Sequence, residues 1–148
     1  IFHKLLFILT IFVFKISNSD NMAKHNILGK NGEKIAAEYL VKQGYDIRDI
    51  NWRNGRYEID IVATQGKYLV IVEVKTRQSD IFGLPEDAIN DKKIRHLIDA
   101  ADSYIKQTDL PFDIRFDIVS IICKENSYEI EHIQDAFYPP IQSKKYGY

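Results

Sequence analysis

The sequence is poor in cysteine. Its single cysteine, Cys123, excludes an internal disulfide. This residue follows the apolar run at positions 118–122, so we expect a small core residue rather than a reactive thiol. The near-absence of cysteine fits a reducing compartment, and we predict a cytoplasmic protein.

The chain also lacks an excess of charge, because 20 Lys and Arg face 21 Asp and Glu and the formal net charge is -1. A surface for phosphates must therefore be a local patch. There is no glycine loop of the kind that cradles nucleotide phosphates. No zinc site is expected either, since metal-ligand spacing is missing from the histidines, which are His3, His25, His96 and His132.

No hydrophobic run is long enough to span a bilayer, so no membrane partner is expected. The longest apolar run near the start covers only residues 5–14, inside a segment, 1–21, that differs from the rest. The only methionine is Met22, which favours upstream sequence included by a misplaced start. A signal peptide, with Ser17 and Ser19 near its cleavage site, is the alternative. We therefore predict one domain at 22–138 and an irregular tail at 139–148.

Hydrophobic spacing predicts the order helix, three strands, helix, strand, with a further short strand at the end. The first helix is expected from Leu28 to Gln43, where Gly44 supplies a C-terminal cap. The second is expected from Pro85 to about Gln107. The strands are expected at 45–52, on both sides of a Gln65-Gly66 turn, at 115–123 and at 128–133.

Acidic residues gather in the two strands beside that turn, in Glu58-Ile59-Asp60 and Glu73-Val74-Lys75. Strand side chains alternate, so the acids and the lysine should share one face of the hairpin. Pairing centred on Gln65-Gly66 would place Glu58 opposite Glu73, and Asp60 opposite Ile71. The other face of the first strand should be filled by Ile59, Ile61 and Ala63.

Residues 68–72 are apolar at every position, which is typical of a strand covered on both faces. Glu73 continues that strand, and a buried carboxylate is costly unless it is paired or binds a cation. Lys75 can neutralise only one of the nearby acids. The pattern alone leaves two interpretations open, an Mg²⁺ or Mn²⁺ site and a structural charge network.

The order of elements, with an acid on the second strand and Glu-x-Lys on the third, resembles the restriction-endonuclease-like PD-(D/E)xK nucleases. More closely, the chain resembles the YraN family of small predicted endonucleases related to archaeal Holliday junction resolvases. The family usually has glycine before the Glu-Ile-Asp string, where this chain has Tyr57. The matching motifs are Gly29-x-x-Gly32-Glu33-x-x-Ala36-x-x-Tyr39-Leu40, Gly44-Tyr45, Asn51-Trp52-Arg53, Glu58-Ile59-Asp60, Val72-Glu73-Val74-Lys75-Thr76-Arg77 and Arg115-Phe116-Asp117.

The resemblance implies an α/β fold with a restriction-endonuclease-like αβββαβ core, in which helices flank a mixed sheet. It implies a metal-dependent endonuclease that hydrolyses phosphodiester bonds in DNA, branched or structured DNA included, and that works as a homodimer. By the same resemblance Asp60, Glu73, the carbonyl of Val74 and Glu33 would hold Mg²⁺ or Mn²⁺, and Lys75 would orient the attacking water. The alternative is a non-catalytic nucleic-acid-binding or protein-interaction module that keeps the fold.

Several roles stay open at this stage. Glu33 is either part of the metal shell or an ordinary first-turn acid. Glu58 either supports the site or pairs with a nearby cation. Trp52 either stacks on an unpaired base or packs in the core. The candidate phosphate-binding cations, each of which could instead be a solvated charge, are Arg53, Arg56, Lys75, Arg77, Lys92, Lys93 and Arg95.

Overall fold

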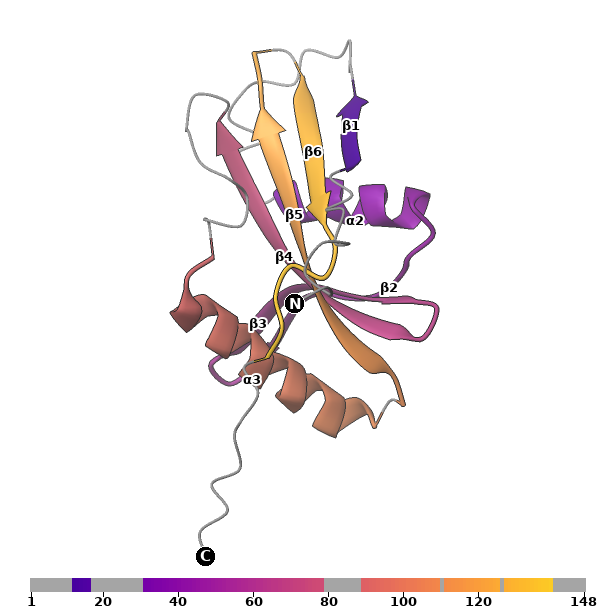
Figure 1. Ribbon diagram of the computed structural model, residues 1–148, viewed down its shortest axis with the longest axis vertical. Coiled ribbons are helices and arrows are strands. Elements are labelled where there is room, and N and C mark those ends of the chain that lie inside the picture. Colours follow the sequence, from indigo (N-terminus) through magenta and orange to yellow (C-terminus); the bar gives the residue numbers. More distant parts are fainter. Residues whose placement is uncertain (1–11, 17–30, 79–88, 110, 126, 140–148) are drawn as a thin grey trace, which may run out of the picture.

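The computed structural model describes residues 12–16, 31–78, 89–109, 111–125 and 127–139 (Figure 1). The positions at which the two helices were predicted to begin, Leu28 and Pro85, lie outside these ranges, as does the tail from 140. The described elements are β1 (Phe12–Ile16), α2 (Gly32–Lys42), β2 (Asp46–Asn54), β3 (Tyr57–Gln65), β4 (Tyr68–Gln78), α3 (Asp91–Thr108), β5 (Asp113–Cys123) and β6 (Tyr128–Ile133).

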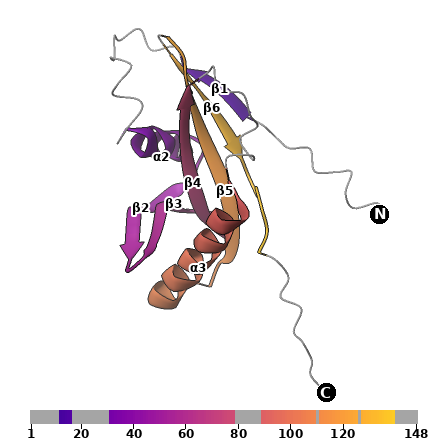
Figure 2. The ribbon, with the colours of Figure 1, turned by 90° about the vertical axis from the view of Figure 1, so that its left-hand side faces the viewer.

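One mixed sheet organises the described part of the chain. Its strand order is β1-β6-β5-β4-β3-β2, and β4 and β5 pair in parallel whereas the other neighbours are antiparallel. The order α2-β2-β3-β4-α3-β5 confirms the predicted αβββαβ core and its α/β class. In the turned view of Figure 2, α2 lies to the left of β4 and β5, and α3 crosses in front of their lower part.

The two helices cover opposite faces of β4. Val70 and Val72 belong to the hydrophobic cluster packed on α2, whereas Leu69 and Ile71 belong to the cluster packed on α3. All four side chains are at most 1% exposed. Burial of such a side chain contributes about 1.5–3 kcal/mol. This confirms that the central strand is covered on both faces.

Each helix begins where a local contact requires it. The first turn of α2 crosses β4 so closely that a Cβ on Gly32 would lie 2.5 Å from Thr76 Oγ1. Gly44, with φ of 87°, follows the C-terminal end of α2, as predicted. Asn90 is extended and its side chain accepts a hydrogen bond from Lys93 N, so α3 starts at Asp91. Residues 89 and 90, which the predicted helix included, are therefore not helical.

The register of the β3–β4 hairpin differs from the predicted one. Gln65 pairs with Tyr68 and Ile61 with Val72, so the turn is Gly66-Lys67. The two strands are therefore displaced by two residues from the prediction, which preserves the faces but makes Asp60, not Glu58, the residue that faces Glu73. Gly66 takes a φ of 56° at the new centre of the turn.

The face predicted for Ile59 is wrong. Ile61 and Ala63 pack in the α2 cluster, whereas Ile59 packs in the α3 cluster. The pairs between β3 and β4 end at Ile61 and Val72, while β3 continues to pair with β2. Beyond the point where β3 separates from β4, the side chains on the two sides of Asp60 no longer point to the same face of the sheet: Ile61 packs in the α2 cluster and Ile59 in the α3 cluster. Asp60 and Glu73 lie just beyond the last pair, and we refer to this place, where the two strands separate, as the opening.

Strand β1 was not predicted from the sequence. It lies within segment 1–21 and pairs antiparallel with β6, from Phe12 opposite His132 to Ile16 opposite Tyr128. The division into 1–21, 22–138 and 139–148 stays a prediction. Among the helices described here, none combines the length and apolar character needed to cross a membrane.

Candidate functional site

Asp60 stands at the point where β3 and β4 separate. Its Oδ2 accepts a hydrogen bond of 2.8 Å from the backbone N–H of Val74 on β4. No β3–β4 backbone pair extends beyond Ile61 and Val72. The carboxylate of Asp60 therefore accepts the hydrogen bond that a backbone carbonyl of β3 would accept in a continuous ladder. This contact holds the side chain of Asp60 against the strand that carries Glu73.

Glu73 is the most buried acid of the opening, with 3% of its side chain exposed. Lys75 Nζ lies 2.8 Å from its Oε1 and Lys93 Nζ lies 3.1 Å from its Oε2. The ion pair confirms that Glu73 and Lys75 share a face. Among the described residues, however, Oε2 accepts no hydrogen bond, and its contact with Lys93 is an ion pair.

The electrostatics of the opening disfavour a second negative charge. Burial, and next the neighbouring charge of Glu73, raise the pKa of Asp60 to about 6, with a smaller contribution in the same direction from Glu33. The Val74 N–H and the charge of Lys93 act in the opposite direction. Two carboxyl groups are therefore held together although the nearby lysines do not fully compensate them.

Glu33 approaches the opening from the first turn of α2. Its Oε2 accepts a hydrogen bond of 2.6 Å from Asn51 Nδ2 on β2. The carboxylate thus points toward the edge hairpin and contributes to the raised pKa of Asp60. The structure brings Glu33 to the same region as Asp60 and gives it a partner that the sequence analysis did not identify.

Glu58 pairs with Arg53, directly opposite on the β2–β3 hairpin, at 2.9 Å. Both side chains are largely exposed, so this pair forms on the outer hairpin. Of the two roles left open for Glu58, the structure shows the charge partner. Arg53 is a solvent-facing cation at the edge of the sheet.

The other predicted phosphate-binding cations are placed differently. Lys93 reaches Glu73, as described, whereas Lys92 is exposed on the same turn of α3. Arg77 lies 3.2 Å from Glu131 on β6 and only 18% of its side chain is exposed. Lys93, like Lys75, is therefore a cation of this group that the structure brings to the acids.

Trp52 is partly buried and packs against the α3 cluster. Its ring meets that of Tyr104 edge-on, with centroids 5.2 Å apart. Of the two roles left open for Trp52, the structure shows core packing. Cys123 is partly buried against the α2 cluster, as expected for a structural thiol.

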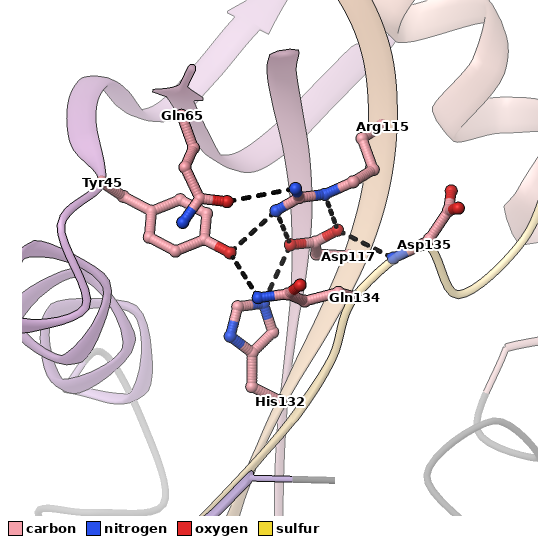
Figure 3. A network of polar contacts seen from close by, with 7 residues as sticks. All are labelled: Tyr45, Gln65, Arg115, Asp117, His132, Gln134 and Asp135. Carbon is pink, nitrogen blue, oxygen red and sulfur yellow. Dashed lines mark hydrogen bonds and ion pairs between the residues drawn. The ribbon is translucent and has the colours of Figure 1, made fainter. Parts of the chain in front are cut away.

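A buried polar network that the sequence analysis missed lies on the α2 face of β5 (Figure 3). Arg115 makes two hydrogen bonds of 2.8 Å to Asp117, and His132 Nε2 lies 2.9 Å from the same carboxylate. Tyr45 and Gln65 accept further hydrogen bonds from Arg115. Only the Arg115–Asp117 pair, two residues apart on one strand, left a signal in the sequence.

Asp117 is ionised within this network. Burial by itself would raise its pKa, but the hydrogen bonds from His132 and Arg115, together with their charges, outweigh burial and hold the pKa below its usual range. Asp117 is opposite Val72, on the face covered by α2, whereas Glu73 is on the α3 face. The network is therefore a separate, internally paired structural unit.

The described residues contain no ready-made cluster of three or more Asp, Glu, His or Cys side chains suited to a metal ion. The metal shell that the resemblance implies is thus only partly assembled. Asp60 and Glu73 lie one position beyond the last β3–β4 pair, and Glu33, which is hydrogen-bonded to Asn51, is close enough for its charge to act on Asp60. The arrangement offers two carboxylates and an adjacent third.

Comparison with known proteins identifies related sequences over most of the chain. Residues 32–121 match the model of a protein family described as "Uncharacterised protein family UPF0102". A UPF0102 protein of Bacteroides fragilis is 51% identical over 120 residues, covering 81% of this chain and 99% of that relative. One from Phocaeicola vulgatus is 48% identical with the same coverage, and one from Flavobacterium psychrophilum is 47% identical over 117 residues, covering 79% and 98%.

Among solved structures, the chain is similar to that of Pyrococcus furiosus SfsA in complex with Ca²⁺. The sequence identity is 16% and the TM-score is 0.29, with 81% of this chain and 66% of that chain covered. This likeness is too distant to carry a functional comparison.

Proposed function

Because the chain belongs to uncharacterised protein family UPF0102, the YraN family, we propose that it is an endonuclease that depends on Mg²⁺ or Mn²⁺ and hydrolyses phosphodiester bonds in DNA. One observation carries the proposal. Asp60 and Glu73 face each other where β3 and β4 separate, and Lys75 contacts the second of these carboxylates. The relation to resolvases makes branched DNA the first substrate to test.

The chemistry of the opening fits a hard divalent cation. Two carboxylates face each other, and Glu73 Oε2 is buried without a hydrogen bond among the described residues. Mg²⁺ and Mn²⁺ prefer oxygen ligands of this kind. Asp60 and Glu73 would hold the cation, with Glu33 adjacent. The carbonyl of Val74 would join them, since the N–H and C=O of a strand residue point to the same side and this N–H points to Asp60.

When bound, the cation supplies Lewis-acid stabilisation of the charge that develops on the phosphoryl oxygens. Lys75 has three donors and keeps one engaged with Glu73, so the remaining donors can orient a water molecule toward the phosphorus. An ammonium group held in an ion pair with Glu73 suits orientation and charge stabilisation better than proton abstraction. Lys75 is therefore the residue that we assign to the water.

Lys93 brings a second ammonium group to the same carboxylate from the first turn of α3. A phosphate that enters the opening would compete with Glu73 for this group, so we assign to Lys93 a contact with the DNA backbone. Lys92 and Arg53 are exposed and can extend that contact outward. A homodimer would place two such openings on one branched DNA molecule.

A second candidate function is favoured by the same lysines. Lys75 and Lys93 both contact Glu73, so this carboxylate already has two cationic partners without a metal ion. A nucleic-acid-binding or protein-interaction module without turnover would need nothing more. The two functions differ in one measurable property, because only the nuclease requires divalent cations to bind at Asp60 and Glu73.

The test is cleavage of labelled duplex, single-stranded and four-way-junction DNA by purified protein in Mg²⁺ or Mn²⁺. We expect cutting by the wild type, and a loss of at least about 100-fold in Asp60→Ala and Lys75→Ala. Glu58→Gln is the matched control, since that acid pairs outside the opening. No cutting of any substrate, or equal cutting by Asp60→Ala, would rule out the proposal. Metal-independent DNA binding would then favour the second function.

A further inference from the structure

We propose that Asn51 is a positioning residue of this site, whose side-chain amide holds Glu33 for the divalent cation at Asp60 and Glu73. The inference rests on the proposed function and deepens it. Three independent features of Asn51 support it: its backbone conformation, its hydrogen bond and its place in the sheet.

The backbone of Asn51 is left-handed, with φ of 55°, in the middle of β2. In the described part of the chain, the other non-glycine residues with positive φ, Asp109 and Asp135, lie outside helices and strands. Left-handed backbone is unfavourable for residues with a side chain, and Asn is among those that tolerate it best. Strain of this kind within a regular strand is typical of residues with a functional role.

This conformation accompanies a short contact between distant segments. Asn51 Nδ2 donates to Glu33 Oε2 at 2.6 Å, across a sequence separation of 18 residues. A hydrogen bond to a carboxylate is stronger than one between neutral groups. The contact therefore fixes the side chain of Glu33, which otherwise starts α2 as a freely rotating first-turn acid.

The register of the hairpin puts Asn51 beside the acids. Ile50 pairs with Ile61 and Trp52 with Ile59, so Asn51 lies opposite Asp60. On the other side of Asp60 is Glu73, one position beyond the last β3–β4 pair, Ile61 and Val72. Asn51 thus joins Glu33 to the strand position that carries the central ligand.

An amide is suited to this task because it is neutral. Lys75 and Lys93 hold Glu73 by neutralising it. Asn51 holds Glu33 by hydrogen bonding and leaves its negative charge available for a cation. Groups that orient metal ligands in this way typically change metal affinity by about 10- to 100-fold when they are removed.

Substitutions can separate the amide from the backbone. Asn51→Gly keeps the left-handed conformation accessible and removes the side-chain amide. Asn51→Ala removes the amide and also disfavours the left-handed conformation. Asn54→Ala is a control on the same strand, because the side chain of Asn54 donates to Ser103 Oγ at 3.0 Å, away from the acids. The full chain is used throughout, and thermal unfolding reports whether each variant folds.

The experiment is titration of each variant with Mn²⁺. Binding is measured by calorimetry and by the loss of the electron paramagnetic resonance signal of free Mn²⁺. We expect Asn51→Gly to bind Mn²⁺ about tenfold more weakly than the wild type, with Asn54→Ala unchanged. Glu33→Gln should weaken binding to a similar extent, and the double variant Glu33→Gln, Asn51→Gly no further, since Asn51 acts through Glu33.

Wild-type affinity in Asn51→Gly would overturn the inference and leave the proposed function standing. So would an effect that adds fully to that of Glu33→Gln, because Asn51 would then act by another route. Absence of Mn²⁺ binding by the wild type would overturn the inference and the metal-dependent function together. The wild-type titration therefore distinguishes the two failures.

Discussion

Asp60 and Glu73 occupy facing positions on β3 and β4, one step beyond the last backbone pair of the hairpin, Ile61 and Val72. Two carboxylates in this arrangement repel each other, and burial adds to the cost of ionising both. Burial and, after it, the repulsion from Glu73 raise the pKa of Asp60 to about 6. Holding these two groups together lowers the free energy of unfolding of the native state. A bound cation would raise it again.

Asp60→Asn is expected to stabilise the protein at neutral pH. The folded-state pKa of Asp60 exceeds its usual value of about 3.9, so wild-type stability is lost as pH rises from about 4 through about 6. The amide removes this loss and keeps an oxygen for the Val74 N–H. We expect a gain of about 1–3 kcal/mol at pH 7.5 in urea unfolding without metal, vanishing below about pH 4.

Glu58→Gln is the control for that measurement, because it removes an acid from the same strand that is paired with Arg53 outside the opening. Its stability should change by less than about 0.5 kcal/mol at every pH. A destabilised Asp60→Asn variant at pH 7.5 would contradict the electrostatic account.

Mn²⁺ is expected to raise the midpoint of thermal unfolding of the wild type and to leave that of Asp60→Asn nearly unchanged. A ligand that binds only the native state stabilises it by about 2.7 kcal/mol at 100 times its dissociation constant. Differential scanning fluorimetry over a range of Mn²⁺ concentrations measures the effect. An equal shift in both proteins would show that the cation binds elsewhere.

Lys93→Met should separate cation binding from turnover. Lys93 lies 3.1 Å from Glu73 Oε2, so its removal leaves that carboxylate less neutralised and free to attract a cation. We expect Mn²⁺ affinity to increase about threefold or more, while DNA cleavage falls about tenfold or more through loss of a phosphate contact.

Lys92→Met is the matched control on the same turn of α3, where the side chain is exposed and has no part in the opening. It should leave Mn²⁺ affinity unchanged and reduce cleavage less than Lys93→Met does, since Lys92 can contact the DNA backbone only outside the opening. If Lys93→Met bound Mn²⁺ no better than Lys92→Met, the role of Lys93 as a competitor of the cation would be wrong.

The sequence predicted what depends on local pattern. Helical spacing identified α2 and α3, and alternation placed Glu73 and Lys75 on one face, as their ion pair confirms. The hairpin register was displaced by two residues because Gln65-Gly66 and Gly66-Lys67 are both credible turn centres. Residues 89 and 90 were included in the predicted helix because Pro85 resembled a helix start more strongly than Asn90 did.

Contacts between distant segments could not be predicted in the same way. Lys93 reaches Glu73 from the next helix, and Asn51 reaches Glu33 from β2. No regular sequence spacing between the partners indicates either contact. The interrupted alternation at Ile59 depends on where β3 leaves β4, which the apolar pattern of β3 does not encode.

Asp117→Asn is expected to destabilise the protein at neutral pH by about 3–5 kcal/mol, since Arg115 and His132 would lose a buried charged partner. The pKa of Asp117 is held below its usual range, so its contribution is present above about pH 4 and is lost as pH falls through the lower folded-state value. Urea unfolding of both proteins between pH 3 and pH 7 should show the difference narrowing in acid. A constant difference would contradict this.

Gly32→Ala is expected to destabilise the protein although alanine favours helices. A Cβ at this position would lie 2.5 Å from Thr76 Oγ1 on β4, closer than two such atoms can approach, so α2 or the threonine must move. We expect a loss of about 1–3 kcal/mol in urea unfolding. Thr76→Ala removes the obstructing oxygen, so the double variant should recover most of that loss. The other atoms near the new Cβ, Ile121 Cδ1 and Thr76 Cβ, lie at ordinary contact distances of 3.7 and 3.8 Å. If the two substitutions were additive, the close approach of α2 to β4 would not be what requires glycine here.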